Sequence, residues 1–163
     1  MNTTRPNILL IISDQHSGLI TTQAGYPHIT TPGIDRLASQ GTSYTRSYSA
    51  NPLCVPERAA LMTGMMPSKS WPHLCDYPCI STILGQADYQ TVYFGKWHVG
   101  YSKMDEVADW HRFDEYQDLL DDSQTTDLSV EYLKRNHEKP FFMVTSLLNP
   151  HDCCELARRI TGL

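Results

Sequence analysis

The chain has 163 residues, enough for one domain with a hydrophobic core and too few for two comfortable ones. Its net charge is −5 at pH 7, so the average field of the protein attracts neither nucleic acid nor an anionic membrane surface. An anionic ligand would have to be held by a local group of cations. No apolar run reaches the ~20 residues of a membrane-spanning helix, so we expect no membrane span.

The first predicted element is a strand over residues 7–13. Its apolar part runs from Ile8 to Ile12, which is typical of a parallel strand buried on both faces of a sheet. This run is too short for the apolar region of a signal peptide. We therefore expect the chain as given to be cytoplasmic, or periplasmic or secreted if an export signal has been lost.

Two helices and a short strand are expected next. Thr31-Pro32 opens a helix that Gly41 ends, because proline suits the first helical position and glycine the end. Residues 43–48 are rich in Tyr and Thr, which favours a short strand. A second helix is expected over residues 57–62, with Pro56 at its first position and Gly64 after its last.

The second half of the chain again alternates between helices and strands. Residues 79–86 are predicted to form a helix that buries Ile80, Ile83 and Leu84. Strands are predicted over residues 90–94 and 141–148, and a helix over residues 126–136. Residues 100–123 are acidic and aromatic without a clear period, which indicates a long surface excursion. The alternation predicts the α/β class, with a mostly parallel sheet sandwiched by helices.

Polar side chains follow each of the three strong strands. Asp14 and Gln15 come after the first, Lys96 and His98 after the second, and His151 after the third. Ligands of such sheets bind beyond the carboxyl ends of the strands. Each of these side chains alone is more often a turn or solvated loop residue, so the prediction of a site depends on their joint occurrence.

The chemistry of these side chains fits an anion and a hard cation. Asp14 and Gln15 offer oxygen ligands of the kind that Ca²⁺ or Mg²⁺ prefers. Lys96 and His98 can bind an oxyanion or protonate a leaving oxygen.

Cys54 stands just before the second helix, where N–H groups without intrahelical partners and the helix dipole favour an anion. Arg58, one turn further on, can reach back to the same point with a planar charged fork. A buried structural cysteine is the plainer alternative for this pattern alone. The five cysteines are odd in number and lack zinc-ligand spacing, which favours free thiols.

Taken together, these motifs resemble the N-terminal part of the type I sulfatase family. The resemblance rests on Cys54-x-Pro56-x-Arg58 with Thr63-Gly64, and on Gly95-Lys96-Trp97-His98-x-Gly100. It extends to Pro6–Ile11 with Asp14, Thr31-Pro32 with Ile34–Ala38 and Gly41, Pro140–Phe142, and Pro150-His151. The match covers nearly the whole chain, which is expected to be the N-terminal part, residues 1–163, of a single catalytic domain whose remainder is absent.

The resemblance implies an alkaline-phosphatase-like fold and hydrolysis of sulfate monoesters. It further implies that a formylglycine-generating enzyme oxidises Cys54 to formylglycine, whose hydrated form is the nucleophile. Arg58, Lys96, His98 and His151 would then hold sulfate or assist proton transfer. Asp14, Gln15 and the group derived from Cys54 would bind Ca²⁺, with Mg²⁺ as an alternative. The substrate would be a small-molecule or carbohydrate sulfate ester.

Two departures from the family pattern matter. Gln15 replaces a second aspartate, which removes one charge from the metal site and leaves phosphonate or phosphate monoesters open as substrates. Glu57 stands where a small residue is frequent in the family, and modification of Cys54 is still expected. Trp97, Tyr101, Trp110 and His111 either line a sugar or aryl pocket or pack the long excursion.

The chain also ends before the later metal ligands that the resemblance implies. One hypothesis is that it carries the family chemistry only when the missing part is present. The other is that the 163-residue product is an inert remnant or a weak anion-binding domain. The truncation also predicts that residues 141–148 form an exposed, aggregation-prone edge strand.

Overall fold

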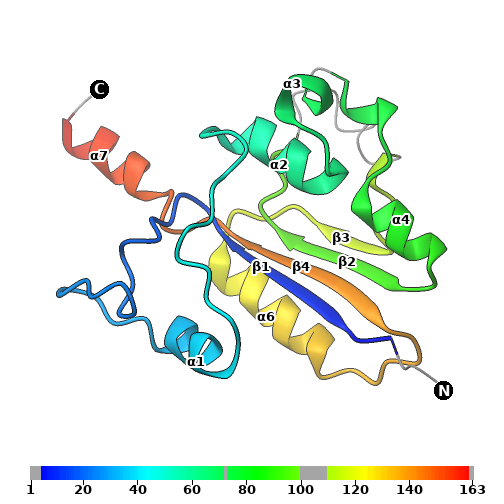
Figure 1. The fold of residues 1–163 in the computed structure, drawn as a ribbon, viewed down its shortest axis with the longest axis horizontal. Coiled ribbons are helices and arrows are strands. Elements are labelled where there is room, and N and C mark those ends of the chain that lie inside the picture. Colours follow the sequence, from blue (N-terminus) through cyan, green and yellow to red (C-terminus); the bar gives the residue numbers. More distant parts are fainter. Residues whose placement is uncertain (1–4, 72, 100–109, 162–163) are drawn as a thin grey trace.

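The structure is a computed structural model that describes residues 5–71, 73–99 and 110–161. Within these residues, four strands form one sheet (Figure 1): β1 (Ile8–Ser13), β2 (Gln90–Gly95), β3 (Glu115–Gln117) and β4 (Phe141–Leu147). Their order is β1-β4-β2-β3, and each neighbouring pair is parallel. The predicted α/β class with a parallel sheet is confirmed.

Helices cover both faces of the sheet. The α2, α3 and α4 helices (Cys54–Thr63, Pro67–Ser70 and Ile80–Gln86) lie over one face, with a 3₁₀ turn at Leu74–Asp76 between α3 and α4 (Figure 1). The α6 helix (Asp122–Leu133) crosses the other face, while α1 (Pro32–Gln40) and α7 (Cys153–Thr161) lie further out. No helix in the described part is long and apolar enough to cross a membrane.

Strand alternation divides the core into two layers. Tyr93, Phe142 and Val144 pack towards α2 and α4 in a cluster with Ala59, Met62 and Trp97. The alternate residues Val92, Phe94, Phe141 and Met143 pack on Tyr132 of α6. The central strands β2 and β4 are therefore buried on both faces, which accounts for their continuous apolar sequences.

The places of the first and last strands were predicted wrongly. β4 pairs with both β1 and β2, so it is central and not an edge. Among the described strands, β1 pairs with β4 alone and is the edge, with Leu9 and Ile11 about half exposed. The first strand was predicted to be covered on both faces, but the face that carries Leu9 and Ile11 is half open. No β1 residue belongs to the described apolar cluster beneath α6.

Three smaller predictions also need correction. Residues 43–48 form no strand, and Tyr44 and Tyr48 are exposed. Ile83 is half exposed, whereas Ile80 and Leu84 pack on the core as predicted. Part of the 100–123 excursion is ordered structure, because β3 extends the sheet there; residues 100–109 lie outside the described part.

Helix boundaries follow their capping residues. The α6 helix begins earlier than predicted, because the Asp121 carboxylate accepts the backbone N–H of Gln124 (3.0 Å) and caps it. The α2 helix begins at Cys54, with Pro56 its third residue, where the N–H has no intrahelical partner in any case. Gly64 ends α2 with φ 69°, as predicted.

Candidate active site

The three strong strands end side by side, so the residues after them meet. The backbone N–H of Asp14 donates to the carbonyl of Leu147 (3.1 Å), and that of Lys96 donates to the carbonyl of Ser146 (2.9 Å). The residues directly after β1 and β2 are thus both hydrogen-bonded to the carboxyl end of β4, and we call the end of each strand with the residues after it the exit of that strand. The residues that follow these three strands therefore lie next to one another.

Asp14 is paired with two buried cations. Its Oδ2 lies 2.5 Å from Lys96 Nζ and 3.4 Å from Arg58 Nη2, and all three side chains are at most 10% exposed. Burial alone would raise the pKa of Asp14, but the hydrogen bond from Lys96 and the charges of Arg58 and Lys96 hold that pKa below its ordinary value. The trio is therefore two cations and one anion, with one surplus positive charge.

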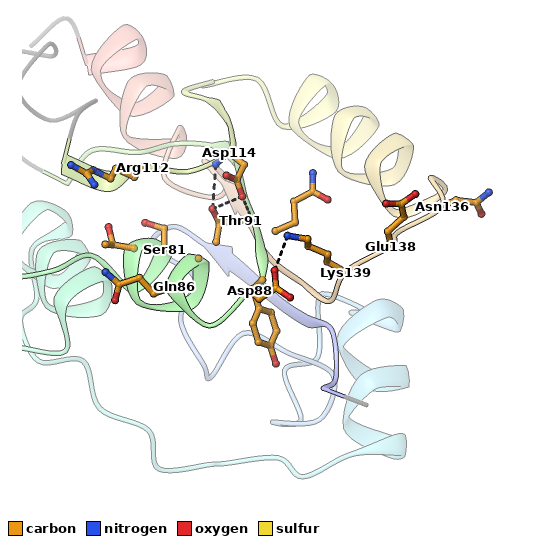
Figure 2. Close-up of a pocket in the computed structure, with 13 residues that line it drawn as sticks. Ser81, Gln86, Asp88, Thr91, Arg112, Asp114, Asn136, Glu138 and Lys139 are labelled. Carbon is orange, nitrogen blue, oxygen red and sulfur yellow. Dashed lines mark hydrogen bonds and ion pairs between the residues drawn. The ribbon is translucent and has the colours of Figure 1, made fainter. Parts of the chain in front are cut away.

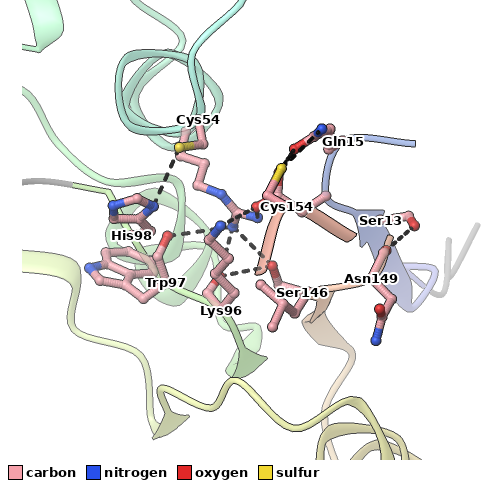
Figure 3. A network of polar contacts seen from close by, with 12 residues as sticks. Ser13, Gln15, Cys54, Lys96, Trp97, His98, Ser146, Asn149 and Cys154 are labelled. Atoms are coloured by element: carbon pink, nitrogen blue, oxygen red, sulfur yellow. Dashed lines mark hydrogen bonds and ion pairs between the residues drawn. The ribbon is translucent and has the colours of Figure 1, made fainter. Parts of the chain in front are cut away.

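Arg58 is anchored by groups that the sequence did not reveal; two residues that supply them, Lys96 and Ser146, are labelled in Figure 3. Its Nη1 donates to the Lys96 carbonyl (2.7 Å), to Ser146 Oγ (2.9 Å) and to Tyr93 Oη (3.2 Å). Tyr93 and Ser146 lie within predicted strands, where side-chain type alone distinguishes neither from an ordinary core residue. Only the strand pairing brings them to Arg58.

Cys54 and His98 are in contact at the N-terminal end of α2. Cys54 Sγ lies 3.4 Å from His98 Nδ1, and a dashed line marks this contact in Figure 3. Burial, followed by the positive charges of Lys96 and Arg58, lowers the pKa of His98, so its imidazole is neutral at pH 7 and able to accept a proton. His98 has φ 45°, so residues 96–98 do not continue as a strand and His98 turns towards α2.

A cavity of about 490 Å³ opens beside these groups. Its lining includes Asp14, Gln15, His16, Cys54, Arg58 and His151. His151 therefore shares one cavity with Cys54, although β4 and α2 are distant in the sequence. The Gln15 side chain contacts Cys154 Sγ (3.6 Å) at the cavity rim.

The donors for a hard cation are of the right kind but few. The Asp14 carboxylate and the Gln15 amide both supply hard oxygens, whereas Ca²⁺ takes about six to eight of them. Within the described residues, no group of three or more His, Cys, Asp or Glu side chains could hold a metal ion. The residues present therefore fit part of a calcium shell and not a whole one.

A larger hollow, of about 840 Å³, lies at the amino ends of β2 and β4 (Figure 2). Three of its charged groups are already partnered: Lys139 Nζ lies 2.7 Å from Asp88 Oδ1, and Asp114 accepts hydrogen bonds from the N–H and hydroxyl of Thr91. Ligands of parallel sheets bind at the carboxyl ends. The smaller cavity at Cys54 is therefore the candidate active site.

The sequence left two roles for four aromatic residues, lining a sugar or aryl pocket or packing the long excursion. The structure describes three of the four. Trp97 and His111 are buried in the core beside Tyr93 and Phe113, and Trp110 is partly buried against the same cluster. These three stabilise the fold around the β2 exit. Tyr101 lies outside the described residues.

The fold and site define an α/β protein with Cys54, Arg58, Asp14 and His151 on one cavity. Behind this lining, His98 contacts Cys54 and Lys96 contacts Asp14. Comparisons place the protein in a family. The family model for sulfatases matches residues 6–162, and the chain belongs to the sulfatase family. It is 28% identical over 190 residues to the ulvan-active sulfatase of Formosa agariphila, covering 91% of this chain and 36% of that protein.

Solved structures agree on the fold. The crystal structure of Ps i-CgsB in complex with k-i-k-neocarrahexaose matches 91% of this chain and 46% of its own, with TM-score 0.78 and 25% identity. The phosphonate monoester hydrolase of Agrobacterium radiobacter shares the fold at TM-score 0.66 and 21% identity, covering 90% of this chain and 41% of its own. The fold is alkaline-phosphatase-like, and the chain spans about a third to a half of these relatives.

Proposed function

We propose that this chain is the N-terminal part of a sulfatase that hydrolyses sulfate monoesters, with a nucleophile made from Cys54. The observation that carries the proposal is the convergence of Cys54, His98, Arg58, Asp14 and His151 around one site at the carboxyl end of the sheet. A formylglycine-generating enzyme oxidises Cys54, and the hydrated aldehyde supplies the attacking hydroxyl. The substrate is a small-molecule or carbohydrate sulfate ester.

The surrounding residues bind sulfate and move protons. Sγ of Cys54 stands where an oxygen of the modified residue would be, and His98 Nδ1 at 3.4 Å is placed to accept its proton. Arg58 and Lys96 attract the anionic ester through their surplus charge. His151, which lines the same cavity, binds a sulfate oxygen or protonates the leaving oxygen.

Asp14 and Gln15 would hold part of the shell of a Ca²⁺ ion, the modified residue 54 would be a further ligand, and Mg²⁺ is the alternative ion. A cation there would polarise the sulfate group. The hard oxygens of both side chains support this assignment. Water and parts of the protein outside the described residues would supply the other ligands, because these three groups fall short of the about six to eight oxygens that Ca²⁺ takes.

The shortage of ligands favours a second reading for the 163-residue chain on its own. It spans 36% of the ulvan-active sulfatase, and its metal shell is partial. We therefore expect the isolated chain to bind anions weakly and to show negligible turnover, whereas the same residues act in hydrolysis when the rest of the catalytic domain is present.

One experiment separates the two readings. The chain is co-expressed with a formylglycine-generating enzyme, and the Cys54 peptide is examined by mass spectrometry for the aldehyde. The purified protein and a Cys54→Ala control are then assayed on an aryl sulfate, with and without Ca²⁺. Calcium-dependent hydrolysis by the modified protein, with none by the Cys54→Ala control, would refute the hypothesis that the isolated chain is inert. Aryl phosphate and phosphonate assayed in parallel test the phosphoryl alternative that Gln15 leaves open.

A further inference from the structure

Three hydrogen-bond donors meet at the backbone carbonyl of Lys96. They are Tyr93 Oη at 2.6 Å, Arg58 Nη1 at 2.7 Å and Ser146 Oγ at 2.8 Å. Both hydroxyls also accept from Arg58 Nη1, at 3.2 Å and 2.9 Å. Each hydroxyl therefore links the Arg58 guanidinium to the Lys96 carbonyl, and both side chains are completely buried.

The backbone of Lys96 is held on its other side as well. Its N–H donates to the carbonyl of Ser146 (2.9 Å), and Gly95 before it has φ 105°. With N–H and C=O both fixed, the Lys96 side chain has a defined starting point from which Nζ reaches Asp14. The same two hydroxyls set the place of Arg58.

Resting on the proposed function, we infer that Tyr93 and Ser146 are positioning residues of the anion site. Neither belongs to the residues that line the cavity. They act through Arg58 and Lys96, whose charges they hold next to His98 and Cys54. Arg58 Nη1 also lies 3.4 Å from the Trp97 carbonyl, so its two hydrogens are shared among four oxygens. Loss of either hydroxyl removes one link between Arg58 and the Lys96 carbonyl, and the guanidinium and the turn after β2 then shift towards the remaining acceptors.

The chain offers a matched control on the opposite face of the sheet. Ser129 Oγ is also buried and bonded to two oxygens, the Thr125 carbonyl (2.7 Å) and Thr145 Oγ1 (2.9 Å). Ser129→Ala therefore deletes a buried hydroxyl of the same kind away from the cavity. A purely structural role predicts the same behaviour for Ser129→Ala and Ser146→Ala.

The test uses the full chain with Cys54 unmodified. Alkylation rates of Cys54 by iodoacetate, an anion, and by iodoacetamide, its neutral analogue, are measured by peptide mass spectrometry in wild type, Tyr93→Phe, Ser146→Ala and Ser129→Ala. The ratio of the two rates reports the positive charge presented at Cys54. Tyr93→Phe keeps the ring and its edge contact with Trp97, so it carries the test should Ser146→Ala not fold.

We expect the ratio of the iodoacetate rate to the iodoacetamide rate to fall about fivefold in Tyr93→Phe and Ser146→Ala. This is the order of magnitude for partial loss of one charge interaction in water. In Ser129→Ala the ratio should stay unchanged. Unchanged ratios in the first two variants, or an equal fall in Ser129→Ala, would overturn the inference. Titration with inorganic sulfate is the second readout. If wild type binds no sulfate while the ratios change as expected, the proposed function fails and the positioning inference stands.

Discussion

Lys96 Nζ lies 2.5 Å from Asp14 Oδ2, and this ion pair joins the exits of β2 and β1 across β4. Arg58 approaches the same carboxylate oxygen from α2. One buried carboxylate thus holds together two strands and a helix at the point where the candidate active site lies. A charge this buried is stabilising only while its partners are present.

Replacing Asp14 by alanine is therefore expected to destabilise the fold strongly. It leaves Arg58 and Lys96 buried as like charges without a counterion, which costs about 3–5 kcal/mol. The measurement is urea denaturation of the variant and of Asp88→Asn. Asp88 also pairs with a lysine and an arginine, but on the surface, so its loss should change stability little. Equal losses in the two variants would contradict a special role for the buried trio.

Gly95 is the second point at which the site depends on one residue. Its φ is 105°, and a Cβ there would lie 2.0 Å from the Ser146 carbonyl oxygen. Gly95→Ala should cost at least ~2 kcal/mol, because both backbone strain and a clash with backbone are imposed. Gly33→Ala in α1, where a Cβ meets nothing within 4 Å, should be neutral or stabilising. Chemical denaturation of both variants tests this, and a tolerated Gly95→Ala would contradict the geometry of the β2 exit.

The parts of the site that follow strands could be predicted, because a buried apolar run and the polar residue after it are both local patterns. Asp14, Lys96 and His98 were found in this way. The order of strands could not be predicted, since pairing depends on contacts across the whole chain. For this reason β4 was misplaced at the edge, and Tyr93 and Ser146 were missed: their hydroxyls matter only once β2 and β4 lie side by side with Arg58 above them.

The remaining errors of the prediction concern short segments. β3 has three residues and no visible alternation, so no pattern in the acidic excursion indicates a strand. Residues 43–48 show the reverse error, because Tyr and Thr favour strands only where a neighbouring strand and a core face exist. The exposed side chains of Tyr44 and Tyr48 show that neither is present in the described structure.

The open edge of β1 predicts self-association of the 163-residue chain. Leu9 and Ile11 are about half exposed on a strand with one unpaired side, and such edges template pairing between molecules. Ile11→Lys should reduce the concentration-dependent growth in mass measured by sedimentation velocity. Ile83→Lys is the matched control, because Ile83 is as exposed as Ile11 but lies on α4. If both variants reduce association equally, or if wild type stays monomeric, the edge is not responsible.

His111 makes the stability of the fold depend on pH. Its ring is buried between Trp97 and Tyr116, and its Nδ1 accepts the backbone N–H of Phe113 (3.2 Å), which requires a neutral ring. Burial lowers the pKa of His111 in the folded protein. The unfolded chain, with the ordinary histidine pKa of about 6.5, therefore takes up a proton first as the pH falls.

The stability that neutral His111 contributes should consequently be complete above pH ~6.5. It should be lost as the pH falls from there towards the pKa of His111 in the folded protein. Over that range the free energy of unfolding should change by at most ~1.4 kcal/mol per pH unit, the value for one proton. The free energy of unfolding of wild type and His111→Phe, measured between neutral pH and about pH 5, tests this. Phenylalanine keeps the aromatic packing and cannot titrate, so the difference between the two proteins should shrink or reverse in favour of the variant on acidification. His28→Phe removes an exposed imidazole and serves as control. A constant difference between wild type and His111→Phe across this range would show that His111 titrates alike in the folded and unfolded chains.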